Sequence, residues 1–310
     1  MKRNPKITVA VPAKNEEENI AACLKAVFAQ TLKPYEVIVV NSKSTDRTEE
    51  IARTFPVKIA YDNYGSIGNA RQAALEAAKG EYIAYTDADC MPEKNWLKNL
   101  SKELRKGVAG VGGGTRNIGE GIWPESIALA LDSFLGSANS VQDRVFADRR
   151  VVKSLSGCNC MYRTADLKKI GGFDTTISLN EDTKISQKMT EQGKLVYVPD
   201  AIVLHNQNLT LGSFIKRMYR FGYGRAKNRM WDLQCVPPVA ALLLLLSLII
   251  TPYILYTLAL YAIVLIAFNL KIFLKAGKLI YLISVPAVYI MQHTSYTLGF
   301  WKGLVSFGGK

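Results

Sequence analysis

An uncharged apolar run from Val236 to Leu270 constrains this chain more than any other feature. At a rise of about 1.5 Å per residue, the run is too long for one membrane span and suits two short ones. Pro252 divides it, so the sequence predicts a helical hairpin that turns near Thr251–Pro252. The alternative, a buried helix of a soluble protein, is disfavoured because no soluble core needs so long an uncharged segment.

Lysines follow the apolar run at Lys271, Lys275 and Lys278, and the positive-inside rule places them in the cytoplasm. A further apolar stretch, 279–299, contains four consecutive polar residues. It either spans the membrane or lies in its interface, and we expect the second. His293 within it is then predicted to meet the headgroup region. We therefore expect a multi-pass protein of the cell membrane whose first domain lies in the cytoplasm.

Composition limits the classes of partner that the protein is expected to bind. The 310 residues include 39 Lys+Arg against 26 Asp+Glu, a formal net charge of +13, which favours nucleic acid, a phosphorylated substrate or a membrane surface. The 5 cysteines form no CxxC pair and predict reduced thiols in the cytosol. The basic N-terminus lacks an apolar core long enough for a signal peptide, so we expect the first domain to stay in the cytoplasm.

Strands and helices alternate over the first 89 residues. Short β-branched or apolar runs predict strands, and segments with apolar residues at helical spacing predict helices between them. Repeated β-α units imply an α/β domain whose sheet is parallel and whose ligands bind at the carboxyl ends of its strands. The strands are expected at 6–13, 35–41, 57–62 and 81–89, and the helices at 15–30, 44–55 and 66–80.

Polar residues gather at those carboxyl ends. The first strand ends in Pro12–Glu16, the second in Asn41–Ser44, and the fourth in Asp87 and Asp89. Residues i and i+2 of an extended strand share a face, so both carboxylates could address one cation. Hard oxygen ligands suit Mg²⁺ or Mn²⁺, which in turn suits a diphosphate, although a lone D-x-D is also common as a surface turn.

Five segments, in order, carry a resemblance. They are "VPAKNEEENI", "VIVVNSKSTDRT", "GNARQAALEAAKGEYIAYTDAD", "SGCNCMYRTADLKKIGGFD" and "NEDTKISQKMTEQGKLVYVPDAIVLH". Through them, Ile7 to His205 resembles a family 2 glycosyltransferase of the GT-A fold, which is Rossmann-like with a mostly parallel sheet and flanking helices. The resemblance implies transfer of a sugar from a nucleotide-diphosphate donor, with inversion at the anomeric carbon.

The resemblance also implies a donor site and a metal site. Asn41 departs from the family's usual aspartate, which leaves the base of the donor open. Arg71 is alternatively a solvated helix arginine, and His205 a structural histidine. The donor residues are Pro12, Ala13, Asn15, Glu16, Asn41, Arg71, Asp87 and Ala88, and the ligands of Mn²⁺ or Mg²⁺ are Asp87, Asp89 and His205.

Glu181 and Asp182 precede an amphipathic helix, so they are either capping acids or catalytic groups. In the family that the chain resembles, the aspartate of this pair is the general base for an acceptor hydroxyl. A phosphate acceptor needs no such base because it is already ionised near neutral pH. The pair therefore favours a hydroxyl over a polyprenyl phosphate, and the resemblance adds Gly157, Asn159 and Glu181 to the acceptor side.

Basic and aromatic residues interleave in 209–235. Because this segment directly precedes the apolar run, contact with lipid headgroups ranks first, contact with the donor diphosphate second, and we expect no nucleic acid. The mostly apolar segment 122–141 rests on the membrane or walls the acceptor cleft, and the sequence does not decide between these.

The predicted organisation is a GT-A catalytic domain over 1–208, a basic amphipathic juxtamembrane segment over 209–235, and transmembrane or interfacial helices over 236–310. The predicted activity moves a sugar from a nucleotide-diphosphate-sugar to a hydroxyl of a lipid-linked or membrane-proximal acceptor. The alternatives are a polyprenyl-phosphate (dolichyl-phosphate) sugar synthase and a non-catalytic membrane scaffold that binds nucleotide-sugar. A processive polymer synthase is disfavoured because a short hairpin offers too few helices for an export channel.

Overall fold

The computed structural model describes residues 4–62, 64–177, 179–247 and 253–306. The chain forms two compact units: Met1–Asn117 with Ser140–Asn206, and Ile118–Asn139 with Gln207–Lys310. The predicted catalytic domain, 1–208, contains 118–139, whereas the structure packs this segment with the C-terminal part of the chain. The assignment of catalytic and juxtamembrane roles to these parts remains a prediction.

The first half of unit 1 has the predicted β-α arrangement. Strand β1 pairs in parallel with both β2 and β4, and β2 pairs in parallel with β3. Helices α1, α2 and α3 make the connections, which confirms the predicted alternation of strands and helices. The bounds are β1 (Ile7–Ala13), α1 (Ile20–Phe28), β2 (Glu36–Asn41), α2 (Thr48–Ala52), β3 (Lys58–Tyr61), α3 (Ile67–Ala77) and β4 (Tyr82–Tyr85).

The second half of unit 1 is antiparallel, so the sheet is mixed rather than mostly parallel. Strand β8 pairs with β4 and β6, and β9 pairs with both β5 and β7. The strand order is β3-β2-β1-β4-β8-β6-β9-β5. The bounds are β5 (Cys90–Pro92), α4 (Trp96–Glu103), β6 (Val108–Ile118), β7 (Arg150–Val152), β8 (Cys160–Arg163), α7 (Thr164–Lys169), α8 (Glu181–Thr190) and β9 (Lys194–Asn206).

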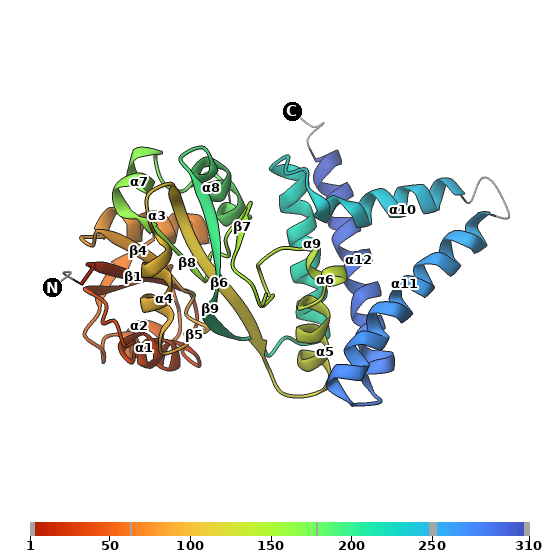
Figure 1. Cartoon of the computed structure of the whole chain (residues 1–310), viewed down its shortest axis with the longest axis horizontal. Helices are drawn as coiled ribbons and strands as arrows, with labels where there is room; N and C mark the ends of the chain where they lie inside the picture. The colour runs from red at the N-terminus through yellow and green to blue at the C-terminus, as the bar shows by residue number, and fades with distance from the viewer. Residues whose placement is uncertain (1–3, 63, 178, 248–252, 307–310) are drawn as a thin grey trace. The chain divides into compact units, whose positions relative to one another are not determined.

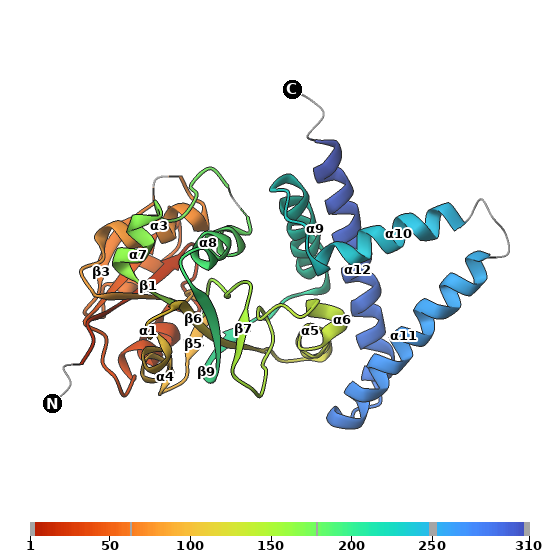
Figure 2. The same cartoon turned by 45° about the horizontal axis from the view of Figure 1, so that its top comes forward.

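Alternation along the strands divides the core of unit 1 between the two faces of the sheet. Val9 and Val11 of β1 pack with buried residues of α1 and α4. Ala10 points the other way and packs with buried residues of α3, α7 and α8. Helices therefore cover both faces of the sheet (Figures 1 and 2). This cover explains why all seven residues of β1 are buried.

Unit 2 is helical, and its central pair is α9 (Leu211–Lys227) and α12 (Tyr281–Val305). Glycines allow the two backbones to meet: a Cβ at Gly222 would lie 2.0 Å from the carbonyl oxygen of Tyr296, and one at Gly299 would lie 2.0 Å from that of Tyr219. The remaining helices are α5 (Ile122–Leu131), α6 (Phe134–Ser137), α10 (Val236–Ser247), α11 (Tyr253–Ala276) and a 3₁₀ turn at Leu233–Cys235.

Among the described residues, one helix is long and apolar enough to cross a membrane, Ile254–Ala276, with a mean hydropathy of 2.1 and 11% of its best window buried. Helix α10 is also apolar, and its described part has 12 residues, about 18 Å. The expectation of two short spans is therefore confirmed for one candidate helix only, and α11 continues past Lys271 and Lys275 instead of ending before them. The predicted turn at Thr251–Pro252 lies outside the described residues.

Helix α12 uses its polar residues within unit 2. Hydroxyl groups of Ser126 and Ser284 lie 2.7 Å apart, and Gln292 donates to the carbonyl of Gly136 over 2.6 Å. The Nδ1 atom of His293 lies 3.0 Å from the hydroxyl of Tyr261. The prediction that His293 meets the headgroup region is therefore not supported, because other helices of the unit occupy its ring nitrogens.

Candidate functional site

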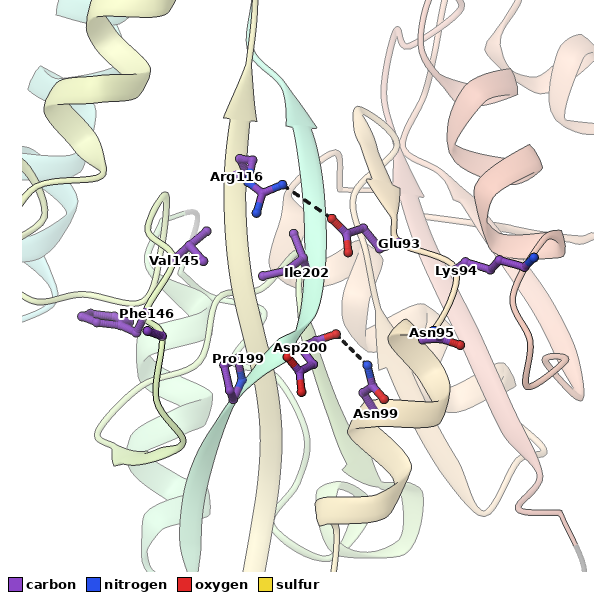
Figure 3. Close-up of a pocket in the computed structure, with 11 residues that line it drawn as sticks. Glu93, Lys94, Asn95, Asn99, Arg116, Val145, Phe146, Pro199, Asp200 and Ile202 are labelled. Atoms are coloured by element: carbon purple, nitrogen blue, oxygen red, sulfur yellow. Dashed lines mark hydrogen bonds and ion pairs between the residues drawn. The ribbon is translucent and has the colours of Figure 1, made fainter. Parts of the chain in front are cut away.

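A groove of about 640 Å³ in unit 1 is not the predicted site (Figure 3). Polar side chains line it: Arg116 lies 3.6 Å from Glu93, and Asn99 donates to the carbonyl of Asp200 over 2.7 Å. Ile202 of β9 also lines it, and an odd spacing of three residues along a strand puts Ile202 on the opposite face from His205. None of the predicted site residues lines this groove.

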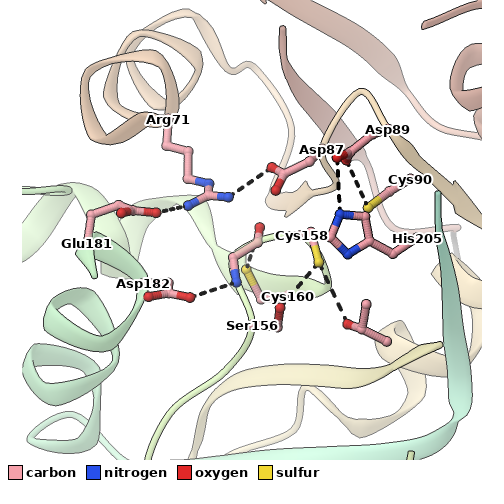
Figure 4. Close-up of polar contacts among 12 residues, drawn as sticks. Arg71, Asp87, Asp89, Cys90, Ser156, Cys158, Cys160, Glu181, Asp182 and His205 are labelled. Carbon is pink, nitrogen blue, oxygen red and sulfur yellow. Dashed lines mark hydrogen bonds and ion pairs between the residues drawn. The ribbon is translucent and has the colours of Figure 1, made fainter. Parts of the chain in front are cut away.

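Asp87 and Asp89 address different partners. Strand β4 ends at Tyr85, and the two aspartates lie in a turn in which the Cys90 N–H donates to the Asp87 carbonyl over 3.0 Å. The expectation of one shared face on an extended strand is therefore wrong. The Asp87 carboxylate contacts Arg71, whereas the Asp89 carboxylate contacts His205 (Figure 4).

Arg71 joins two acidic segments. It lies on α3, which begins at a Ser66 cap, and its side chain is 3% exposed. Nη2 donates to Asp87 Oδ1 over 2.8 Å, and Nη1 donates to Glu181 Oε1 (Figure 4). Burial opposes the charged form, but the neighbouring carboxylates of Asp87 and Glu181 hold the pKa of Arg71 well above its usual value. The alternative of a solvated helix arginine is excluded.

Glu181 and Asp182 start α8 but differ in their surroundings. The Glu181 side chain is 7% exposed, and burial raises its pKa to about 7 against the opposing charge of Arg71. Asp182 is half-buried. Its Oδ2 accepts from the Gly157 N–H over 3.3 Å, and its Oδ1 accepts from the Thr183 N–H over 2.7 Å. Asp182 thus has a capping contact and is also the less enclosed carboxylate of the two.

His205 lies between two carboxylates. Its Nε2 is 3.1 Å from Asp89 Oδ2, and its Nδ1 is 3.6 Å from Asp143 Oδ1. Burial alone would lower the pKa of His205, but the contacts with Asp143 and Asp89 raise it well above the usual value. Asp143 belongs to no motif, and nothing in its local sequence distinguishes it. Only the folded chain brings it to the ring.

The donor atoms around His205 fit a divalent cation. Asp89, Cys90 and His205 each offer one atom, and these atoms lie within 4.8 Å of one another. The carboxylate suits Mn²⁺ or Mg²⁺, and the imidazole beside it is better accepted by Mn²⁺, the softer of the two ions. Burial holds the pKa of the Cys90 thiol well above its usual value, so the neutral thiol is the poorer ligand. Asp87, which we also expected to bind metal, has an oxygen engaged by Arg71 instead.

The loops after β1 and β2 meet, as predicted for neighbouring parallel strands. The Asn15 N–H donates to Ser44 Oγ over 3.1 Å, and the Glu16 N–H donates to Thr48 Oγ1 over 2.7 Å. Burial raises the pKa of the Glu16 carboxyl, and the nearby charges of Asp89 and Asp87 add to the effect. The Pro12 and Ala13 residues end β1, and both they and Ala88 are buried.

Asn41 is occupied by its own neighbours. Its Nδ2 donates to Glu49 Oε2 over 2.6 Å, and its Oδ1 accepts from the Ser44 N–H over 2.9 Å. Glu49 also accepts hydrogen bonds from Arg53 and Tyr61. At the position where the family usually has an aspartate, this chain therefore has an asparagine that contacts the carboxylate of Glu49. The contact between Asn41 and Glu49 is not evident from the sequence, because the two residues lie in different elements.

The residues expected on the acceptor side lie in different environments. Asn159 is fully buried, accepts from Trp96 Nε1 over 2.8 Å, and donates to the carbonyls of Gly114 and Ala201. Its hydrogen bonds hold the core together, so the structure does not place it where an acceptor could reach it. Gly157 is near the predicted site: a Cβ there would lie 2.4 Å from Arg71 Nη1, so the guanidinium requires a glycine.

Comparison with known proteins shows which family the chain is similar to. The sequence model described as Glycosyl transferase family 2 matches residues 8–171. The chain is 32% identical over 243 residues to "Glycosyltransferase AglE" of Haloferax volcanii, covering 74% of this chain and 75% of that protein. It is 26% identical over 324 residues to a Methanococcus voltae protein, covering 96% and 97% of the two chains. That protein is named "Dolichyl N-acetyl-alpha-D-glucosaminyl phosphate 3-beta-D-2,3-diacetamido-2,3-dideoxy-beta-D-glucuronosyltransferase".

Among solved structures, the fold is similar to that of the mannosyltransferase PcManGT from Pyrobaculum calidifontis in complex with GDP-Man and Mn²⁺. The TM-score is 0.66 at 21% sequence identity, and the alignment covers 98% of this chain and 88% of the other. At that identity the likeness establishes the fold, and it confirms the predicted GT-A architecture.

Proposed function

Because the chain belongs to glycosyl transferase family 2, we propose that it moves a sugar, with inversion, from a nucleotide-diphosphate-sugar to a hydroxyl of a lipid-linked acceptor. The observation that carries this proposal is the half-buried carboxylate of Asp182 at the start of α8, beside the Arg71–Glu181 pair. The name of the Methanococcus voltae relative, with its dolichyl-phosphate-linked sugar acceptor and 3-beta linkage, supports a hydroxyl acceptor on a lipid carrier.

Asp182 is the better general base of the acidic pair. An Oε1 of Glu181 accepts from Arg71, and its side chain is 7% exposed, so it is poorly placed to receive a proton from an acceptor. Asp182 is held from one side by the Gly157 N–H, which orients the carboxylate without enclosing it. A base of this kind removes the hydroxyl proton as the oxygen attacks the anomeric carbon.

The donor would lie against the loops that follow β1, β2 and β4. A cation held by Asp89 and His205 would neutralise charge on the leaving diphosphate. Arg71 holds Asp87 in place beside this position and links it to the segment that carries Asp182. The chain's own residues thus fix the acid-rich turn relative to the base before any ligand binds.

Unit 2 would hold the enzyme at the cytoplasmic face of a membrane. Helix α11 supplies an exposed apolar span that ends in Lys271 and Lys275, both exposed. On α9, Lys216, Arg220 and Lys227 are exposed and fall on one helical face, since they are spaced at i, i+4 and i+11. A basic stripe of this kind suits anionic lipid headgroups, and it is the feature of the predicted juxtamembrane segment that supports membrane contact.

The test is the kinetics of Asp182→Asn in the full chain, with a lipid-linked sugar as acceptor. Loss of general-base catalysis should lower turnover by about 10²–10⁴-fold while donor affinity changes little. The amide keeps an oxygen that can accept from the Gly157 N–H, so the fold should survive. Asp166→Asn, on an exposed turn of α7, is the matched control.

Two alternatives make different predictions in the same assay. A polyprenyl-phosphate sugar synthase would tolerate Asp182→Asn, and its product would be acid-labile because the sugar is joined through phosphate. A non-catalytic scaffold would bind nucleotide-sugar without turnover in the wild type. Either result would overturn the hydroxyl-acceptor proposal.

A further inference from the structure

The ring of His205 is held from both sides by carboxylates that come from distant parts of the chain. Asp89 lies in the turn before β5, and Asp143 lies in the loop before β7. The His205 side chain is 9% exposed and that of Asp143 is 8% exposed, whereas Asp89 is 28% exposed. The Asp89 side of the ring is therefore the more open one, and the Asp143 side is enclosed.

The loop that carries Asp143 is fixed by contacts of its neighbours. The Thr115 N–H donates to the Arg144 carbonyl over 3.3 Å, and the Phe146 N–H donates to the Tyr197 hydroxyl over 2.8 Å. The Phe146 and Tyr197 rings also pack edge to face at 5.4 Å. These contacts hold the backbone next to Asp143 independently of His205, so Asp143 can orient the ring rather than follow it.

Asp143 itself is not among the atoms that can share a cation. The cluster of potential ligand atoms contains Asp89, Cys90 and His205 but not Asp143. Its Oδ1 faces Nδ1, the ring nitrogen that does not face Asp89. A histidine that binds a metal through one nitrogen commonly donates its other ring N–H to a carboxylate, which sets the tautomer and the ring plane.

We propose that Asp143 is a positioning residue that receives the Nδ1–H of His205 and so directs Nε2 toward the cation held by Asp89. The inference rests on the proposed function, because it assumes that Asp89 and His205 bind the divalent cation of the donor complex. It adds a residue outside every motif of the sequence, and it assigns the loop that carries the buried Asp143 a part in cation affinity.

The test measures Mn²⁺ affinity by electron paramagnetic resonance, with the full chain in detergent and no donor present. Asp143→Ala should weaken Mn²⁺ binding by about 10- to 100-fold, the usual effect of losing such a partner. Asp143→Asn keeps an oxygen that can accept the ring N–H, so it should recover most of that loss. Asp148→Ala removes an exposed carboxylate five residues away in the same loop and should leave the affinity unchanged.

A further variant separates this inference from the proposed function. If Asp89→Ala binds Mn²⁺ as well as the wild type, the cation site itself is wrongly assigned. If Asp89→Ala loses binding while Asp143→Ala retains wild-type affinity, the cation site stands and the role of Asp143 is overturned. Equal losses in Asp143→Ala and Asp143→Asn would also overturn it, since charge rather than orientation would then matter.

Nitrogen NMR gives a readout that leaves Asp143 unchanged. The chain has 2 histidines, so His293→Gln leaves His205 as the single ring signal. With diamagnetic Mg²⁺ bound, we expect Nδ1 to carry the proton and Nε2 to be the unprotonated nitrogen. A bound form with the proton on Nε2 would contradict the inference.

Discussion

The guanidinium of Arg71 donates a hydrogen bond of 2.8 Å from Nη2 to Oδ1 of Asp87. The same group donates from Nη1 to Glu181. One buried cation therefore pairs with two carboxylates that lie far apart in the sequence. A pair of close aspartates is costly unless something positive meets it. In this protein Arg71 forms an ion pair with Asp87, and His205 contacts Asp89.

Breaking this link should destabilise unit 1. Arg71→Met removes a buried cation and leaves Glu181 enclosed without its partner, a change that typically costs about 3–5 kcal/mol of unfolding free energy. Urea unfolding followed by tryptophan fluorescence measures this loss. The double variant Arg71→Met/Glu181→Gln should recover part of it, because the unpaired buried carboxylate is then gone.

Arg47→Met is the control for this experiment. Arg47 precedes α2 and forms an exposed ion pair with Glu50 in the first turn of that helix. We expect it to leave the unfolding free energy unchanged. If Arg71→Met behaved like Arg47→Met, the pair would not support the fold.

Stability should fall as pH rises toward neutrality, and Glu181 should be the cause. Burial raises its pKa from 4.5 to about 7, so between these values the folded state binds more protons than the unfolded state. Stability then decreases with pH across this window, by at most about 1.4 kcal/mol per pH unit for one proton. In Glu181→Gln this component should vanish. A wild-type stability that rose with pH relative to Glu181→Gln over the same window would contradict the assignment.

The contact between α9 and α12 should tolerate no side chain at Gly299. A Cβ there would lie 2.0 Å from the Tyr219 carbonyl oxygen, so Gly299→Val must separate the helices, and we expect a clear fall in the melting temperature of the full chain in detergent. Gly212 is also on a helix of this pair but has no atom within 4 Å of its Cβ position. Gly212→Ala should therefore be neutral or slightly stabilising. Similar effects of the two changes would show that the helices do not meet at Gly299.

The end of α11 should lie on the cytoplasmic side. All 5 native cysteines are buried, so Lys271→Cys or Lys275→Cys adds an accessible thiol against a low background. A membrane-impermeant maleimide should label these variants in lysed cells but not in intact cells. Labelling in intact cells would reverse the orientation, and recovery of the full chain in the soluble fraction after carbonate extraction would argue against membrane insertion.

Local sequence determined much of this protein. Continuous β-branched or apolar runs and period-3.6 patterns located the β-α units from β1 to β4, because a strand buried on both faces is apolar throughout and a helix buried on one face is apolar at every third or fourth residue. The apolar run after Val236 was evident for the same reason, since an uncharged segment of that length is rare in a soluble core. The polar residues at strand ends followed from the parallel sheet, whose carboxyl ends meet at one edge.

Tertiary structure decided the partners of the charged side chains. Asp87 and Asp89 were expected to share a cation, but a turn after Tyr85 sends one to Arg71 and the other to His205. Asp143 could not be found from the sequence at all. A charge has no periodicity that reveals its partner, and its energy depends on burial and on distances of 3 to 4 Å that only the folded chain sets.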